Sequence, residues 1–165
     1  MFIGDDVMRS LIDLKSELVN GEVGHIYVFT GEEFKIRSIY VEKICEIVGK
    51  YQFMDSMESL YKELSKKPLF RIKTCYICYG DNEYLKQSDK VYEKLLAKVK
   101  DNVVVLVFEN IEERSKFFKF FDEYITIFNR VSDDIAVKYV NKQCHVPLKI
   151  AQEIAFNCNL SLIHI

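Results

Sequence analysis

The stretch NVVVLVFEN, residues 102 to 110, is an almost unbroken run of apolar residues that ends in a polar pair. A continuous apolar run of this length predicts a strand buried on both faces, as in the middle of a parallel sheet. HIYVFTG, residues 25 to 31, has the same character. Three further β-type segments lie at residues 51 to 55, 73 to 79 and 125 to 131. The sequence therefore predicts five strands.

Segments with helical periodicity alternate with these strands. Apolar residues three and four positions apart predict helices within residues 4–21, 56–67, 88–100 and 113–124, and Ser88 is the expected cap of the third. A further helix follows the first strand directly. This alternation predicts a three-layer α/β fold with a five-stranded, mostly parallel sheet.

The helix after the first strand carries a capping signature. Thr30 is the expected N-cap, because Glu33 lies three residues further on. The predicted buried stripe of this helix consists of Ile36, Ile39, Tyr40, Ile44, Ile47 and Val48.

The composition is that of a globular protein, with 49% hydrophobic and 29% charged residues in 165. No apolar run approaches the roughly 20 residues that a transmembrane helix needs, so we expect no membrane association. The first ten residues lack the features of a secretory signal, and five cysteines without a disulfide-like spacing suggest reduced thiols in the cytoplasm. A formal net charge of −2 means that contact with DNA would need a local patch or a partner.

The turn after the first strand, FTGEEFKIRS at residues 29 to 38, is where a phosphate-binding loop would lie in such a fold. It lacks the several glycines and the terminal lysine and hydroxyl residue of a Walker loop. Glu32 and Glu33 would instead repel a phosphate at the helix N-terminus. We therefore expect no nucleotide or other cofactor, and we interpret Asp81, Glu83 and Glu109 as helix caps and solvated strand ends.

Cys75 and Cys78 stand three residues apart in a predicted strand, which places their side chains on opposite faces of the sheet. They cannot share one metal ion and are expected to be core residues. The three histidines, His25, His145 and His164, have no partners in a spacing that indicates a catalytic set.

The run KFFKFF admits two interpretations. Phe117, Phe118, Phe121 and Tyr124 repeat at helical spacing, which favours burial against the sheet and leaves Phe120 open. The alternative is stacking on single-stranded bases.

An apolar pair, Leu69 and Phe70, follows Pro68 within the basic stretch KKPLFRIK, residues 66 to 73. An early start of the next strand would bury both side chains, and physical grounds alone favour this interpretation. Alternatively, the pair is an exposed anchor for a partner, and Arg71 and the neighbouring lysines form the solvated polar rim of the interface.

The order of these segments resembles the delta subunit of bacterial DNA polymerase III, the clamp-loader subunit that opens the sliding clamp. IYVFTGEEFKIRS at 26–38 is similar to the first strand and turn of that family, and KKPLFRIKTCYIC at 66–78 to its Pro-Leu-Phe segment. VVVLVFENIEERSKFFKFF at 103–121 resembles its later strand and helix. Residues 132 to 162 resemble the beginning of its helical lid, as two short helices separated by CHV.

The resemblance implies an AAA+-like domain without a nucleotide site over residues 1–131 and an incomplete helical lid over 132–165. The lysine- and tyrosine-rich sequence of this chain would fit a divergent or phage-encoded member of that family. The implied function is non-catalytic: a subunit of the polymerase holoenzyme that binds the sliding clamp and helps to open it during replication. The implied partners are the clamp, other clamp-loader subunits and, indirectly or weakly, DNA.

The resemblance also implies site residues. Leu69 and Phe70 would insert into the apolar pocket of a clamp protomer, flanked by Pro68 and Arg71. The alternative function is that of a degenerate P-loop-like ATPase or a DNA-processing enzyme on the same scaffold. The fold class is what supports this alternative.

Overall fold

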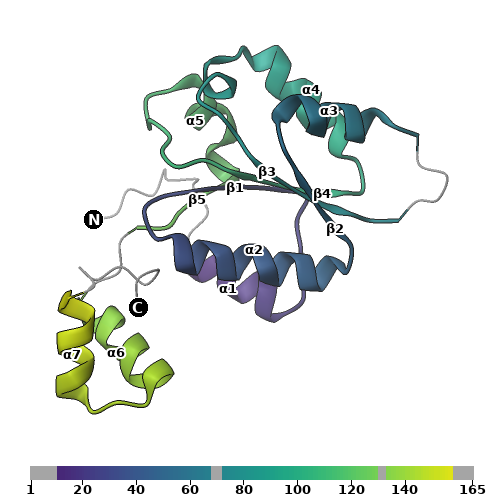
Figure 1. Ribbon diagram of the computed structural model, residues 1–165. Coiled ribbons are helices and arrows are strands. Elements are labelled where there is room, and N and C mark those ends of the chain that lie inside the picture. Colours follow the sequence, from purple (N-terminus) through teal and green to yellow (C-terminus); the bar gives the residue numbers. More distant parts are fainter. Residues whose placement is uncertain (1–10, 68–71, 130–132, 158–165) are drawn as a thin grey trace.

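A five-stranded sheet forms the centre of the computed structural model, which describes residues 11–67, 72–129 and 133–157 (Figure 1). The strands are β1 (Ile26–Thr30), β2 (Tyr51–Met54), β3 (Cys75–Tyr79), β4 (Val103–Val107) and β5 (Ile125–Ile127). Their order across the sheet is β2-β3-β4-β1-β5, and every neighbouring pair is parallel. The prediction of five strands in a mostly parallel sheet is confirmed.

The two strands with the longest apolar runs lie side by side in the middle of this sheet. β4 pairs with β3 on one side and with β1 on the other, with Leu106 opposite Cys78 and Val28. All residues of β1 and β4 are buried. Continuous apolar sequence is what a strand needs when helices cover both of its faces.

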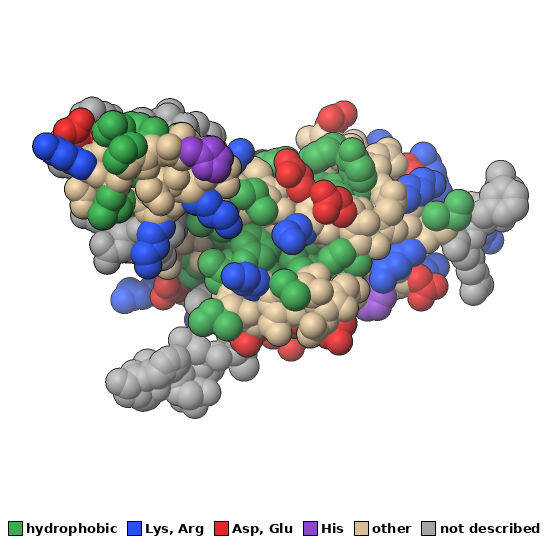
Figure 2. Space-filling view, turned by 90° about the horizontal axis from the view of Figure 1, so that it is seen from below, with side chains coloured by type: hydrophobic (Ala, Val, Ile, Leu, Met, Phe, Trp, Pro, Cys, Tyr) green, Lys and Arg blue, Asp and Glu red, His purple; other side chains and the backbone are tan. Residues whose placement is uncertain are grey.

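Helices cover both faces of the sheet (Figure 1). On one face lie α1 (Leu11–Val19) and α2 (Phe34–Val48). On the other lie α3 (Met57–Ser65), α4 (Asp89–Val99) and α5 (Lys116–Phe121), with the short 3₁₀ turns η1 (Tyr84–Lys86) and η2 (Asp122–Tyr124). The three-layer α/β prediction is confirmed. Basic, acidic and apolar side chains mix on the face that carries α1 and α2 (Figure 2).

The sheet separates two buried clusters, and the two strand cysteines belong to different ones. Cys75 lies with Cys45 in the cluster beneath α1 and α2, whereas Cys78 lies in the cluster beneath α3, α4 and α5. There its thiol is 3.5 Å from the sulfur of Met57. Burial raises the pKa of Cys78 to about 11 and also raises the pKa of Cys75. The prediction of core cysteines on opposite faces is confirmed.

The aromatic side chains of α5 point into the cluster beneath α3 and α4. Phe117 and Phe121 are fully buried, and the Phe117 ring meets Tyr92 edge to face at 5.3 Å between centroids. Phe118, Phe120 and Tyr124 are partly buried against the same cluster. Burial, rather than base stacking, therefore explains the run KFFKFF.

The predicted start of α2 is wrong. Thr30 is the last residue of β1, and the N-cap is Glu33, whose carboxylate accepts a hydrogen bond from the Lys35 backbone N–H. The helix begins later because the backbone of Thr30 remains engaged with the sheet, where its carbonyl accepts from Phe128. Glu32 and Glu33 accordingly precede the first helical turn.

The buried stripe of α2 also differs from the prediction. Its buried residues are Arg37, Val41, Ile44 and Cys45, while Ile47 is exposed. The other predicted stripe residues, Ile36, Ile39, Tyr40 and Val48, are half-buried. The helix is thus rotated toward the side on which Val41 and Cys45 face the sheet.

The last two described helices, α6 (Asp133–Cys144) and α7 (Leu148–Asn157), form a hairpin in which Val140 and Ala151 are fully buried (Figure 1). The prediction of two helices is confirmed, but residues 145–147 separate them, because Cys144 still belongs to α6. The boundary after residue 131 and the assignment of this part as a lid stay predictions. No helix in residues 11–67, 72–129 and 133–157 is long and apolar enough to cross a membrane.

Candidate functional site

The turn after β1, the place of a phosphate-binding loop, is packed against the chain that follows β5. Gly31 has a φ of +116°, and a Cβ at this position would overlap the backbone of Phe128. The Phe128 N–H donates to the carbonyl of Thr30 at 2.7 Å, and the Glu33 N–H donates to the carbonyl of Phe128 at 3.0 Å. Neighbouring backbone therefore occupies the inside of this turn.

The N-terminus of α2 is capped by its own side chain. Glu33 is 3% exposed, and its carboxylate lies 3.1 Å from the Lys35 N–H. A phosphate bound at a helix N-terminus would need these free N–H groups and a positive local field. The carboxylate of Glu33 supplies the opposite charge at the same place. The turn is suited to structural closure and not to phosphate binding.

Arg37 holds the turn from the helix side, a role that the sequence interpretation missed. Its guanidinium donates to the Gly31 carbonyl at 3.2 Å and lies 4.5 Å from the centre of the Phe34 ring. Burial lowers the pKa of Arg37, and electrostatic interactions with Tyr79 and Glu109 oppose this shift. One signal was available: Arg37 precedes Val41 and Ile44 by four and seven residues, the spacing of one buried helical face.

The acidic residues that follow the strands have the expected structural roles. Asp81 accepts a hydrogen bond from the N–H of Tyr84, the first residue of η1, at 3.0 Å. Glu83 lies 3.7 Å from Lys86 in an exposed ion pair, and Glu109 is exposed. Within the described ranges no three His, Cys, Asp or Glu side chains are grouped to hold a metal ion.

The predicted clamp-binding residues, Pro68, Leu69, Phe70 and Arg71, lie outside the described residues, so their role stays a prediction. The segment that contains them runs from the end of α3 to the start of β3. Because all strands are parallel, β3 begins at the amino edge of the sheet, opposite the closed turn at the carboxyl end of β1 (Figure 1).

The described residues on both sides of that segment are exposed. Lys66 and Lys67 precede it, and Ile72 and Lys73 follow it. Ile72 is 55% exposed. This part of the amino edge therefore presents lysine charge together with an accessible apolar side chain, the chemistry expected at the margin of a protein interface.

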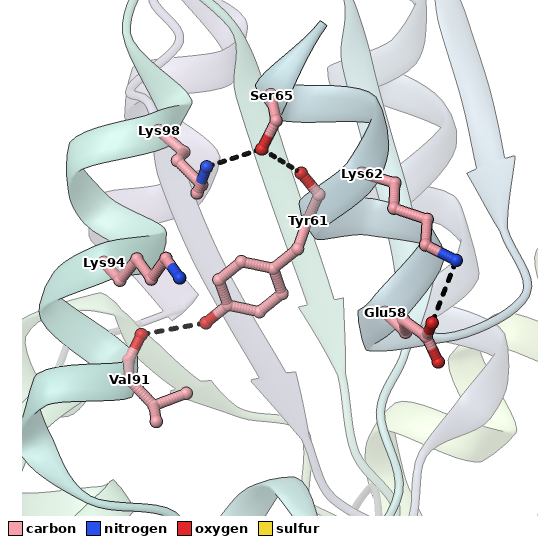
Figure 3. A pocket seen from close by; sticks show the side chains of 7 residues that line it. All are labelled: Glu58, Tyr61, Lys62, Ser65, Val91, Lys94 and Lys98. Carbon is pink, nitrogen blue, oxygen red and sulfur yellow. Dashed lines mark hydrogen bonds and ion pairs between the residues drawn. The ribbon is translucent and has the colours of Figure 1, made fainter.

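A groove of about 500 Å³ lies between α3 and α4 (Figure 3). Its lining contains three lysines and one glutamate, together with one hydroxyl, one aromatic and one aliphatic side chain: Glu58, Tyr61, Lys62, Ser65, Val91, Lys94 and Lys98. The sequence alone does not predict this groove. The available signal was the repeat of lysines every four residues along α4, at Lys90, Lys94 and Lys98.

Comparison with known sequences finds no matching family model and no matching curated protein. Solved structures do match. The delta protein of the Bacillus subtilis DNA clamp loader superposes with a TM-score of 0.64 at 14% identity, over 93% of this chain and 54% of its own. The present chain thus spans about half of that protein's length. A chain in the HORMA, CdnC and Trip13 complex of Escherichia coli MS115-1 has a TM-score of 0.46 at 8% identity, over 81% and 59% of the two chains.

The first of these similarities concerns fold, because 14% identity is too low to transfer residue roles. The second is too weak to support an argument. The first similarity shows that the protein, with its parallel sheet covered by helices, shares the α/β fold of that clamp-loader delta protein.

Proposed function

We propose that this chain acts as a non-catalytic, delta-like clamp-loader subunit, or as part of one, in cytoplasmic DNA replication. It binds the sliding clamp and helps to open it, and its other partners are further clamp-loader subunits. The observation that carries this proposal is the similarity in fold to a clamp-loader delta protein over 93% of the chain.

The closed turn after β1 supports the non-catalytic part of the proposal. Glu33 caps α2, and Phe128 packs against Gly31, where a nucleotide-binding loop would hold phosphates. A subunit built this way contributes binding energy instead of ATP hydrolysis. The ATPase alternative has no comparable support in the geometry of this turn.

The proposed contact with the clamp uses Leu69 and Phe70, with Pro68 and Arg71 beside them. Support comes from the resemblance of KKPLFRIK to the clamp-binding segment of the delta family and from the exposed Ile72 and basic residues next to it. Burial of two such side chains in a pocket would contribute about 1.5 to 3 kcal/mol each. This is enough to dominate a small interface.

Opening of the clamp follows if the chain binds one form of the ring better than the other. A ligand shifts a conformational equilibrium only by its difference in affinity for the two states. The proposed apolar pair would favour the open or monomeric clamp, provided that its pocket is more accessible in that form.

A pull-down against the sliding clamp of the same organism tests this function. Wild-type chain should retain the clamp, and the double variant Leu69→Ala/Phe70→Ala should lose most of the retained clamp. A matched control is Ile12→Ala/Val19→Ala, because these α1 side chains are 81% and 69% exposed and α1 covers the face of the sheet opposite to α3 (Figure 1).

The control variant should bind as the wild type does, and all variants should show the same circular dichroism and thermal midpoint. Undiminished retention by the folded Leu69→Ala/Phe70→Ala variant would rule out the proposed anchors. Failure of the wild-type chain to bind the clamp at micromolar concentrations would overturn the function itself.

A further inference from the structure

The groove between α3 and α4 brings cationic side chains from both helices together (Figure 3). Lys94 and Lys98 lie one helical turn apart on α4, and Lys62 belongs to the lining on α3, where its ammonium group turns to Glu58 (Figure 3). Positions four apart on a helix are neighbours, with about 5 to 6 Å between their Cβ atoms. The groove therefore carries a row of positive charges and not a single one.

These charges are incompletely neutralised. Glu58 pairs with Lys62 at 2.9 Å, but both side chains are exposed, so the pair contributes little. Lys98 donates a hydrogen bond to the Ser65 hydroxyl, and no ion pair to Lys94 or Lys98 occurs among the residues that the structure describes. Three lysines against one glutamate leave an excess of two positive charges in the lining of a chain whose net charge is −2.

An aromatic ring is fixed across the groove, between α3 and α4. Tyr61 reaches from α3 across to α4, where its hydroxyl donates to the Val91 carbonyl at 2.9 Å (Figure 3). The same hydroxyl lies 2.8 Å from that of Tyr84. A tyrosine is neutral at physiological pH, and burial raises the pKa of Tyr61 further. A ring held at both ends loses little conformational entropy when a ligand packs against it.

We propose that this groove binds single-stranded nucleic acid. Lys94 and Lys98 contact successive phosphates, and a base packs against Tyr61. Positively charged grooves with aromatic platforms are the general solution for binding single strands without sequence preference. An acidic peptide would use the lysines but would not need the fixed ring, which is why the geometry favours a nucleic acid. The inference does not depend on clamp binding.

Fluorescence anisotropy with a labelled oligothymidylate of about 12 nucleotides tests the site. The variant Lys94→Gln/Lys98→Gln should bind at least about tenfold more weakly near 50 mM salt. The slope of log K against log salt should become less negative by about 1.4, since each phosphate contact on a single strand contributes about 0.7. The control Lys15→Gln/Lys43→Gln removes two exposed lysines from α1 and α2, on the other face of the sheet.

The control variant should retain wild-type affinity and slope. Equal losses in the two lysine variants, or an unchanged slope in Lys94→Gln/Lys98→Gln, would show unspecific attraction and overturn the site. Binding of a labelled glutamate-rich peptide in place of the oligonucleotide would overturn the ligand class. Absence of oligonucleotide binding at low salt would overturn both.

A pair of substitutions isolates the ring. Tyr61→Phe and Tyr61→Leu both remove the hydroxyl and its bonds to Val91 and Tyr84, but the first keeps the ring. Base stacking on an aromatic side chain is worth about 1 to 3 kcal/mol, so the Leu variant should bind about tenfold more weakly than the Phe variant. Equal affinities of the two variants would contradict a stacking role for Tyr61.

Discussion

Gly31 and Phe128 are in direct backbone contact, which joins the turn after β1 to the end of β5. Backbone hydrogen bonds on both sides of Gly31, from Phe128 to Thr30 and from Glu33 to Phe128, fix this arrangement. The contact closes the position at which a related α/β protein could hold a phosphate. The same contact explains why position 31 needs glycine and why the turn is unsuited to nucleotides.

Gly31→Ala should destabilise the protein far more than Gly21→Ala. Both glycines have positive φ, +116° and +74°, but a Cβ at Gly21 has nothing within 4 Å, whereas one at Gly31 overlaps Phe128. We expect about 1 kcal/mol for Gly21→Ala and about 3 kcal/mol or more for Gly31→Ala. Urea denaturation measures both, and equal losses would contradict the contact.

Mg²⁺-ATP should not bind saturably to the closed turn. The Glu33 carboxylate occupies the N-terminus of α2, and the Glu33 N–H is bonded to Phe128. Isothermal titration calorimetry at millimolar nucleotide checks this expectation. A saturable binding heat would contradict this expectation and would favour the ATPase alternative.

The stability of the protein should fall as the pH rises above about 9. Burial raises the pKa of the Cys78 thiol from 9.0 to about 11, so the unfolded chain releases this proton at a lower pH than the folded one. The stability is complete below about pH 9 and decreases as the pH rises toward 11, by up to about 1.4 kcal/mol per pH unit for one thiol. Cys75, whose pKa burial also raises, acts in the same direction.

Urea denaturation between about pH 8 and 10 measures this dependence. Cys78→Ala should be less stable at neutral pH, because it leaves a cavity, but its stability should decline less steeply with pH. The exposed Cys144 provides the control, since Cys144→Ala should keep the wild-type decline. Identical pH profiles for Cys78→Ala and the wild type would refute the assignment.

Thr126→Val should stabilise the protein. Thr126 is 1% exposed, and its hydroxyl has no hydrogen-bond partner among the described residues. An unsatisfied buried hydroxyl costs about 1 to 3 kcal/mol, and valine has nearly the same shape, so we expect a gain of about 1 kcal/mol. Thr74→Val is the matched control: its hydroxyl donates to the Ile72 carbonyl at 3.1 Å, so this change should destabilise. A thermal melt that ranks the two variants in the opposite order would contradict the prediction.

The sequence predicts β1 and β4 well because strands buried on both faces need unbroken apolar runs, and few other elements do. It predicts the separation of Cys75 from Cys78 for a similar reason. Successive side chains of a strand point to opposite faces of the sheet, so residues three apart lie on opposite faces. Such features depend on local periodicity alone. Local periodicity therefore accounts for the agreement in the sheet and in the helices that cover it.

Features that depend on contacts between distant segments are not predicted. The start of α2 is displaced from Thr30 to Glu33 because Phe128, nearly one hundred residues later, bonds to the turn. Arg37 is buried because its partner is the carbonyl of Gly31, which periodicity does not reveal. The lysine groove likewise arises from the packing of α4 against α3, which brings Lys94 and Lys98 opposite Lys62.

Hydrogen–deuterium exchange in the presence of the sliding clamp tests the central claim most directly. The account predicts that clamp binding slows amide exchange in peptides that cover residues 66 to 74 and leaves exchange in α1 and α2 unchanged. Leu69→Ala/Phe70→Ala should abolish this protection. Protection confined to another part of the chain, or none at saturating clamp, would contradict the proposed function of this segment.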